Sequence, residues 1–474
     1  MYSSALFTDL YEMTMIQGYF FHEKNPNVVF DMFFRKPPYN GGFSVFAGLG
    51  ELINRLEGLK FGEEELSYLE SLGTFKPAFL EYLKDFRFTG DLYAMDEGSL
   101  VFPGEPLIRI HSSLIEAQLI EGLLLNVVNF QTLIATKAAR IYSATGNGTI
   151  LEFGLRRAQG IDGALSAARA AYIGGASATS NTYAGMKYNI PVSGTMAHSW
   201  VMAFESELES FRKYYELYPD NVVLLIDTYD SLGSGIENAI IIGQELKKRG
   251  KRLGVRLDSG DLQYLSSRVR RRLDEAGLED AFIAVSNELN EEIIRQLVTN
   301  RAPIDVWGVG TQLVTGGSDS ALSGVYKLCS KQENGSMVPT LKVSDNPEKT
   351  TNPGIKQVYR FYNGNSGPIA DLIALEDEII DGSRAYQLYH PMYEFKHCSL
   401  SHFDQVRPML AKKIENGAAL SESPPLADIR KTALNELDRL DDTYKRIINP
   451  HIYKVSLTQK LRDLKFRMLD ERTV

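Results

Sequence analysis

The chain has 474 residues, of which 44% are hydrophobic and 23% are charged, and its formal net charge is -9 at pH 7. This is the composition of an ordinary globular protein, and the length predicts roughly two to four domains. The acidic balance argues against a general nucleic-acid-binding protein, which needs basic surface to neutralise phosphates. The two cysteines, Cys329 and Cys398, have the spacing of neither a metal site nor a disulfide framework, which fits a reducing compartment.

No part of the sequence predicts export or insertion into a membrane. The amino terminus has no basic region followed by an apolar core, so we expect no signal peptide. The most apolar stretch, 114–130, is interrupted by Glu116 and Glu121 and is too short for a membrane span. We therefore expect a cytoplasmic protein that binds neither membranes nor nucleic acid.

The first part of the chain predicts a mixture of helices and strands. We expect a helix over 8–18, a strand over 28–34, a basic turn-rich loop over 35–42, strands over 88–111, and a long helix, broken once, over 114–142. A different pattern begins after these elements.

Between residues 150 and 311 the sequence alternates between short apolar segments and amphipathic ones. Helical periodicity is found, for example, over 234–249 and 261–276. Six apolar segments, each followed by polar residues, are expected to be strands: 150–153, 190–192, 222–226, 254–255, 282–285 and 306–307. Such β-α units form parallel sheets whose carboxyl ends share one rim, where many side chains can reach one ligand. Because a regular barrel has eight strands, six predict an irregular or incomplete β/α barrel.

The remaining sequence returns to mixed elements. A polar stretch over 331–356 predicts a long connection, which strands over 357–362 and 385–393 and helices over 426–448 and 458–469 follow. We predict three segments: an N-terminal α/β domain segment over 1–125, the catalytic barrel over 126–345, and a segment over 346–474 that completes the N-terminal domain and ends in helices.

His198 is the only histidine among the polar clusters that follow the predicted strands. It comes after a glycine-containing turn, where an imidazole can act as a nucleophile or as a general acid and base. A structural histidine or a helix cap is the alternative interpretation.

Three arginines and two aspartates lie at other predicted strand ends. Arg156, Arg157 and Arg256 offer guanidinium groups that suit a phosphate or a carboxylate, with surface ion pairs as the common alternative. Asp227 and Asp258 are candidate partners of a hydrated Mg²⁺ or of sugar hydroxyls, with helix capping as the alternative.

A glycine-rich segment follows the last predicted strand. Gly308, Gly310 and Thr311 would let backbone N–H groups approach a phosphate at a helix start. Leu313 occupies the third glycine position of a dinucleotide fingerprint, and the Gly-Lys-Ser/Thr of a P-loop is missing. The segment therefore predicts contact with a single phosphate group.

Together these motifs resemble those of the nicotinate phosphoribosyltransferase family. The resemblance covers most of the chain, through the segments 8–11, 33–36, 152–160, 194–199, 255–261 and 308–311. It implies the fold of type II phosphoribosyltransferases, in which an irregular β/α barrel accompanies an α/β domain built from both chain ends. It also implies a homodimer with a shared active site.

The resemblance implies a reaction and a set of site residues. Nicotinate and 5-phosphoribosyl 1-pyrophosphate would give nicotinate mononucleotide and pyrophosphate in NAD biosynthesis, with Mg²⁺ as cofactor and ATP as a hydrolysed co-substrate. His198 is implied to be transiently phosphorylated by ATP. The residues implied to contact the pyridine are Tyr11 of the partner subunit, Phe153, Thr195 and Arg256. Those implied to lie along the phosphoribosyl donor are Arg156, Gly310 and Thr311.

Two other functions stay compatible with the sequence. A nicotinamide phosphoribosyltransferase would share the architecture and bind a neutral amide in place of a carboxylate. A catalytically silent barrel that binds NAD precursors is the second alternative, although His198, the arginines and both aspartates argue against it. A barrel lyase is disfavoured because no lysine lies at a predicted strand end to form a Schiff base.

Overall fold

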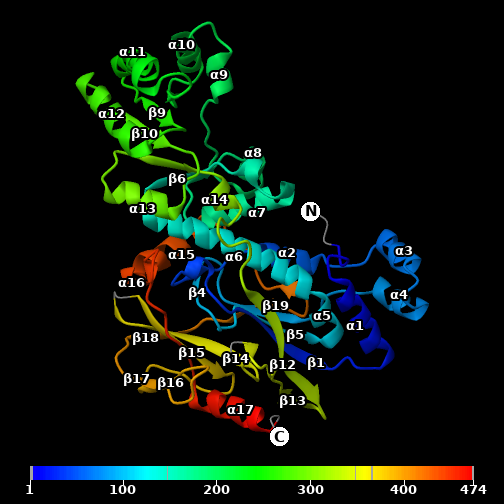
Figure 1. Ribbon diagram of the computed structural model, residues 1–474. Helices are drawn as coiled ribbons and strands as arrows, with labels where there is room; N and C mark the ends of the chain where they lie inside the picture. Colours follow the sequence, from blue (N-terminus) through cyan, green and yellow to red (C-terminus); the bar gives the residue numbers. More distant parts are fainter. Residues whose placement is uncertain (1–3, 147, 347–348, 365–366, 472–474) are drawn as a thin grey trace. The chain divides into compact units, whose positions relative to one another are not determined.

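The structure is a computed structural model that describes residues 4–146, 148–346, 349–364 and 367–471. The chain divides into two compact units. The first combines the residues up to Leu133 with those from Ala321 onward, and the second is Ile134–Ser320. Figure 1 shows how the carboxyl-terminal part of the chain returns to the elements of the amino-terminal part.

The main sheet of the first unit contains strands from both ends of the sequence. Its strands in spatial order are β13 (Ser336–Pro339), β12 (Gly324–Glu333), β1 (Asn27–Phe34), β5 (Ile108–Ser113), β3 (Asp91–Ala94), β19 (Ala411–Glu415) and β20 (Ala418–Ala419). Strand β1 pairs antiparallel with both β5 and β12, and β3 pairs with β19. The carboxyl-terminal segment thus completes the amino-terminal domain, as the resemblance implied.

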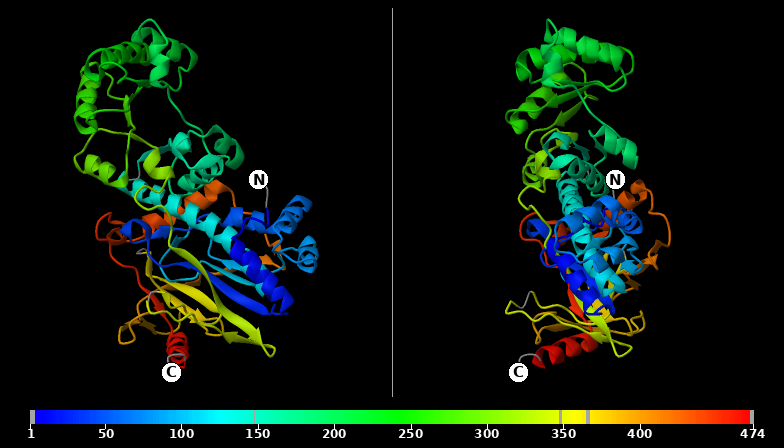
Figure 2. Two further views of the ribbon diagram at one scale, coloured as in Figure 1. Left: turned by 45° about the vertical axis from the view of Figure 1, so that its right-hand side comes forward. Right: turned by 90° about the vertical axis from the view of Figure 1, so that its right-hand side faces the viewer.

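A second sheet of the first unit comes from the carboxyl-terminal segment. Its strands in order are β17 (His397–Leu400), β16 (Tyr386–Tyr389), β21 (Val455–Leu457), β15 (Pro368–Leu375), β14 (Lys356–Tyr362) and β18 (Gln405–Pro408). Helix α17 (Gln459–Asp470), red in Figure 2, packs against β15 and β16. A short pair, β2 (Ser44–Val45) and β4 (Leu100–Val101), adds to this unit.

The long helix that the sequence predicts over 114–142 is broken once, near residue 120. Helix α5 (Leu114–Leu119) ends there, and α6 (Glu121–Ala144), whose residues from Ile134 onward belong to the second unit, begins two residues later. The other helices of the first unit are α1 (Leu10–Phe21), α2 (Leu49–Glu57), α3 (Glu63–Ser71), α4 (Pro77–Lys84), α15 (Leu426–Arg439) and α16 (Asp442–Lys445).

The second unit is built on a parallel sheet. Its strands in order are β7 (Ala178–Thr179), β6 (Thr149–Glu152), β11 (Val306–Val309), β10 (Phe282–Val285), β9 (Gly254–Leu257) and β8 (Val223–Leu225). The helices between them are α7 (Gly160–Ile173), α8 (Thr182–Tyr188), α9 (His198–Met202), α10 (Glu207–Leu217), α11 (Ile236–Lys248), α12 (Leu262–Glu275), α13 (Glu291–Thr299) and α14 (Thr311–Val314). This confirms the irregular β/α barrel.

One predicted strand of the barrel is wrong. Residues 190–192 form no strand, and Val192 makes only an isolated bridge to Thr179. Pro191 has no N–H to donate to a ladder, which disfavours a longer pairing. The edge strand is β7 instead, which the sequence did not single out because two residues are too short to give a pattern.

The stretch over 331–356, which we predicted to be a connection, begins with a hairpin. Strands β12 and β13 are joined by Asn334 and Gly335, whose φ angles are 50° and 81°. Two positive φ values are the signature of a type I′ turn, for which Asn-Gly is the preferred pair. Because β12 pairs with β1, residues 321–345 lie in the first unit. We assigned them to the barrel from the sequence, and that boundary is wrong.

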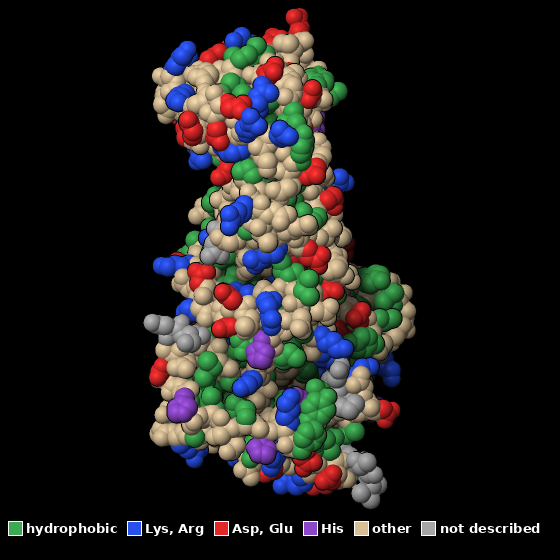
Figure 3. All heavy atoms as spheres, turned by 60° about the vertical axis from the view of Figure 1, so that its left-hand side comes forward, with side chains coloured by type: hydrophobic (Ala, Val, Ile, Leu, Met, Phe, Trp, Pro, Cys, Tyr) green, Lys and Arg blue, Asp and Glu red, His purple; other side chains and the backbone are tan. Residues whose placement is uncertain are grey.

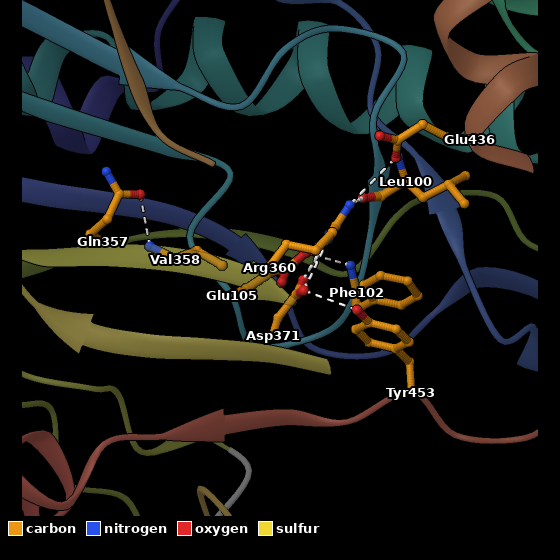
Figure 4. Close-up of polar contacts among 9 residues, drawn as sticks. All are labelled: Leu100, Phe102, Glu105, Gln357, Val358, Arg360, Asp371, Glu436 and Tyr453. Carbon is orange, nitrogen blue, oxygen red and sulfur yellow. Dashed lines mark hydrogen bonds and ion pairs between the residues drawn. The ribbon is translucent and has the colours of Figure 1, made fainter. Parts of the chain in front are cut away.

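A buried ion cluster joins segments of the first unit that are far apart in sequence (Figure 4). Arg360 has no exposed surface, and it donates to both carboxylate oxygens of Asp371 and, at 2.8 Å, to the carbonyl of Leu100. Glu105, also fully buried, lies 3.6 Å from the same guanidinium, and the Tyr453 hydroxyl donates to Asp371 at 3.0 Å. Burial and the neighbouring Asp371 carboxylate raise the pKa of Glu105 well above its ordinary value.

The surface carries both signs of charge. Figure 3 shows one face of the molecule, on which basic and acidic side chains are intermixed and form no continuous basic stripe. That face therefore lacks the charge pattern of a general nucleic-acid-binding surface. Of the helices that the structure describes, none combines the length and hydrophobicity that a membrane span requires.

Candidate active site

A cavity of about 340 Å³ lies in the second unit. It is lined by residues that follow the strands of the parallel sheet, because parallel strands bring their carboxyl ends to one rim. Apart from Asp227 and Tyr11, all the predicted site residues line it: Phe153, Arg156, Thr195, His198, Arg256, Asp258, Gly308, Gly310 and Thr311. The structure therefore brings together side chains that are up to 158 positions apart in the sequence, from 153 to 311.

His198 is the first residue of α9. Its Nδ1 lies 3.1 Å from the hydroxyl of Thr228, and its Nε2 lies 3.8 Å from a carboxylate oxygen of Asp258. The imidazole is 42% exposed, so a ligand in the cavity can reach it. This is the arrangement of an oriented imidazole with one accessible ring nitrogen.

Arg256 extends from β9 and is largely buried. Its guanidinium donates to the Thr195 hydroxyl and, at 3.3 Å, to the carbonyl of Met196, while its buried Nε has no acceptor in the described part of the chain. Burial lowers the pKa of Arg256, and the carboxylates of Asp258 and Asp227 oppose that effect. The side chain is thus a fixed cation with donor capacity left for a ligand.

The two aspartates are linked to each other and do not cap helices. One oxygen of Asp227 accepts from the backbone N–H of Asp258 at 2.8 Å and from the Ser259 hydroxyl at 2.6 Å, while its other oxygen is buried and has no hydrogen-bond partner among the described residues. Asp258 in turn accepts from the Ser286 hydroxyl. The cap of α12 is Asp261, so the helix-cap alternative does not describe Asp258.

Phe153 fits closely against Gly308 of β11 and against Gly310, which follows that strand. A Cβ atom at Gly308 would lie 2.7 Å from Cδ2 of the Phe153 ring, and one at Gly310 would lie 3.2 Å from the Phe153 carbonyl oxygen. Only glycine at 308 leaves the ring where it is. Gly310 immediately precedes α14, while Arg156 and Arg157 lie in a short turn of helix (Leu155–Arg157), exposed at the cavity.

Tyr11 belongs to α1 of the first unit. It is 51% exposed, and its hydroxyl donates to the Glu12 carboxylate at 3.3 Å. Burial, followed by the charges of Glu121 and Glu12, raises the pKa of the Tyr11 hydroxyl to about 12, so the group is neutral at pH 7.

Sequence reasoning missed three residues that hold the site in place. Thr228 contacts the imidazole and Ser286 donates to Asp258. Glu152 is 1% exposed and accepts from the N–H of Gly154, which fixes the turn that carries Phe153. Burial raises the pKa of Glu152. A charged residue inside an apolar strand was the available signal for Glu152.

Three family models match the chain. The nicotinate phosphoribosyltransferase N-terminal domain matches residues 6–129, the nicotinate phosphoribosyltransferase family model matches 149–366, and the C-terminal domain matches 355–465. Together they cover both units.

Individual proteins give the same result. The chain is 45% identical to a nicotinate phosphoribosyltransferase of Bacillus subtilis, over 99% of this chain and 97% of that protein. The crystal structure of human nicotinic acid phosphoribosyltransferase is 30% identical and superimposes with a TM-score of 0.85, covering 97% of this chain and 99% of that one. A nicotinate-nucleotide pyrophosphorylase from Pyrococcus furiosus shares the fold, with a TM-score of 0.71 at 23% identity over 91% and 94% of the two chains. The chain belongs to the nicotinate phosphoribosyltransferase family.

Proposed function

We propose that this protein transfers the phosphoribosyl group of 5-phosphoribosyl 1-pyrophosphate to the ring nitrogen of nicotinate, giving nicotinate mononucleotide and pyrophosphate. The observation that carries this proposal is the buried guanidinium of Arg256 beside the Thr195 hydroxyl, in a cavity that Phe153 also lines. A carboxylate that leaves water needs charge-assisted donors, and an aromatic face suits the planar ring attached to it. The names of relatives that match over nearly their whole length support the same activity.

The reaction requires cations near the leaving group and a pyridine ring that is held in place. A bond forms between the pyridine nitrogen and C1 of the ribose while the bond from C1 to pyrophosphate breaks. Because this leaves oxocarbenium character at the ribose, the leaving group must be neutralised and the pyridine held at attack distance. Arg156 is available for the donor, and the face of Phe153 would stabilise the cationic product ring.

A direct assay tests this function. Purified protein is incubated with the donor, Mg²⁺ and either nicotinate or nicotinamide, with and without ATP. We expect nicotinate mononucleotide to form much faster than nicotinamide mononucleotide. Equal rates with the two pyridines would overturn the choice of nicotinate, and no product with either would leave only a binding role.

The two aspartates fit a magnesium ion that arrives with pyrophosphate. No group of three His, Cys, Asp or Glu side chains suited to a metal occurs in the described ranges, so an ion there depends on substrate oxygens and water. Mg²⁺ typically takes only one or two carboxylates in such sites. Asp227 keeps a buried oxygen without a hydrogen bond, and Asp258 lies next to it. When bound, the ion would neutralise charge on the departing pyrophosphate.

We expect Asp227→Asn and Asp258→Asn to slow turnover and to raise the Mg²⁺ concentration that gives half the maximal rate. The increase should be at least about tenfold, a loss seen even for groups that merely support a metal ligand. Asp261→Asn is the matched control, since asparagine caps a helix as well as aspartate does. Titrations of rate against Mg²⁺ decide the matter, and unchanged curves for both site variants would remove the aspartates from metal binding.

We propose that His198 accepts the γ-phosphoryl group of ATP. If Nδ1–H donates to Thr228, the lone pair lies on Nε2, which is the nucleophilic nitrogen. The bond from Nε2 to phosphorus would form as ADP leaves, and water would later release phosphate. Coupling these steps to the transfer would let ATP hydrolysis drive it.

His198→Ala should abolish the acid-labile, alkali-stable label that wild-type protein takes from γ-labelled ATP. It should also abolish the stimulation of the transferase rate by ATP, because no other histidine lines the cavity. His402→Ala, at an exposed position of the first unit, is the control and should behave as wild type. Label that persists in the His198 variant would show a different acceptor.

We propose that a homodimer shares the site, with Tyr11 of one copy reaching the cavity of the other. The half-exposed Tyr11 ring and the exposed Leu10 beside it support a partner at α1. Mixing Tyr11→Ala with His198→Ala should recover about a quarter of the ATP-stimulated activity of the wild type, which each variant lacks by itself. In a random mixture half of the two-fold dimers are mixed, and each has one intact site.

A second mixture controls for simple stabilisation by the partner. His198→Ala and Arg256→Met affect the same cavity, so no mixed dimer of these two variants has an intact site, and no activity should return. Equal recovery in both mixtures, or none in the first after confirmed subunit exchange, would count against sharing.

A further inference from the structure

The first unit contains a second cavity, of about 270 Å³, that shares no residue with the candidate active site. It lies between the end of β1, the turn at 103–106, residues 350–356, the loop at 390–392, residues 452–455 and helix α17. These segments come from both ends of the sequence, and each contributes side chains to one hollow.

Most of the charged side chains that line this cavity are basic. Four basic side chains, Arg35, Lys36, Lys356 and Lys465, line it with one carboxylate, Asp31. Asp31 is 2.8 Å from the Lys356 ammonium, and both of these side chains are almost fully buried. Besides that pair, Arg35 and Lys465 bring positive charge to the cavity.

Lys465 is a buried cation that has no counter-ion among the residues that the structure describes. Its side chain, on α17, is 4% exposed, and it donates to the Asn352 side-chain oxygen and to the Pro391 carbonyl, both at 2.9 Å. Within the described parts of the chain no carboxylate lies within 4 Å of its ammonium group. Burial, together with the charge of Lys356, lowers the pKa of Lys465 to about 8. An ammonium group has three protons, so one remains for a ligand.

Arg35, which also lines the cavity, adds an unsatisfied donor. Its Nε is buried and has no acceptor among the described residues. His390 contributes no charge, because its Nδ1 accepts from the N–H groups of Met392 and Tyr393 and burial lowers its pKa. Two cations with unused donors therefore face the same space.

The remaining walls are apolar. Phe33, Pro106 and Val455 line the cavity, and Met392 and Ile452 add apolar groups that are 42% and 83% exposed. A ligand that fits both kinds of wall has an anionic group at one end and an apolar or planar body at the other.

We propose that this cavity binds a small phosphate ester, with its phosphate held by Lys465 and Arg35 and its apolar or planar body against Phe33, Pro106 and Ile452. A phosphate dianion matches the two positive charges of Lys465 and Arg35 better than a single carboxylate does, and the guanidinium fork suits phosphate oxygens. The site is independent of the proposed transferase function.

Isothermal titration with phenyl phosphate tests the site. Wild-type protein should show one more binding site per chain than Lys465→Met, and Arg35→Gln should weaken that site at least tenfold. Lys460→Met is the matched control: Lys460 lies on the same helix, is 52% exposed and pairs with Asp377. Equal stoichiometry and affinity in wild type and Lys465→Met would overturn the proposal.

Comparison of probes tests the class of ligand. Phenyl phosphate should bind at least tenfold more tightly than inorganic phosphate or benzoate. If inorganic phosphate binds equally well, the apolar walls have no role and the assignment to a phosphate ester is wrong. If benzoate binds equally well, the site is a carboxylate site.

A measurement on the unmodified protein covers the case in which the variants do not fold. Acetic anhydride at pH 8 should acetylate Lys465, whose lowered pKa leaves much of it neutral. Phenyl phosphate should slow this acetylation at least tenfold, as followed by peptide mass spectrometry, while phenol at the same concentration should not. Labelling that phenyl phosphate leaves unchanged would overturn the site.

Discussion

Arg256→Met should lower kcat/KM for nicotinate by roughly ten- to a hundredfold, because one charge-assisted hydrogen bond is worth about 1.5–3 kcal/mol and about 1.4 kcal/mol is a factor of ten. The guanidinium is buried, donates to Thr195, and has an Nε that finds no acceptor within the described residues, so a substrate carboxylate would complete its contacts. Nicotinamide offers no charge to this group and would direct its own NH₂ toward other donors. Wild-type protein should therefore prefer nicotinate by at least about a hundredfold, as sites built for one polar group do.

Parallel measurements of kcat/KM with both pyridines check this expectation. In Arg256→Met the preference should shrink mainly through weaker use of nicotinate, with the nicotinamide value changed little. Arg271→Met, at a position that is 70% exposed on α12, is the control and should retain the wild-type preference. Similar values for both pyridines in wild-type protein would instead favour a nicotinamide phosphoribosyltransferase.

The parallel sheet could be predicted because its strands are short apolar runs with polar residues at one end. Five of the six predicted segments correspond to β6, β8, β9, β10 and β11. Periodicity failed at the edge of the sheet, where β7 has only two residues, and Pro191 lies in an apolar run that resembles a strand. Edge strands this short have no pattern to detect.

The same limit explains the misassigned hairpin. Strand β12 contains Lys327 and Lys331 among its apolar residues, so it does not look like a central strand, although β1 pairs with it along its length. Asn334-Gly335 was a usable turn signal within the stretch that we treated as a loop.

In the candidate site, the charged and chemically reactive residues could be predicted from the sequence, but the residues that hold them in place could not. His198, Arg256 and Asp258 stand out at strand ends because charged groups there are hard to explain by packing. Thr228 and Ser286 are neutral hydroxyl residues, which are common near strand and helix ends, so only their contacts in the structure distinguish them. Whether Tyr11 contacts the cavity of a second copy depends on how two chains associate, and local sequence patterns do not predict that association.

The cluster around Arg360 gives the largest expected effect on stability. Arg360→Met should lower the free energy of unfolding of the first unit by about 3–5 kcal/mol, since removing one partner leaves buried carboxylates uncompensated. Glu105→Gln should lower the free energy of unfolding far less, because the raised pKa of Glu105 favours the neutral carboxyl group, which glutamine nearly matches in shape. When the pKa of Glu105 is higher in the folded protein than in the unfolded chain, the protonated group stabilises the fold below the ordinary pKa of glutamate. This contribution is lost as the pH rises through the pKa of the folded protein. Glu105→Gln should therefore also make the free energy of unfolding depend less on pH. Urea denaturation of both variants between pH 4 and 9 measures these differences. Equal stabilities of Arg360→Met and Glu105→Gln would mean that the buried charges do not hold β14 and β15 to the amino-terminal segment.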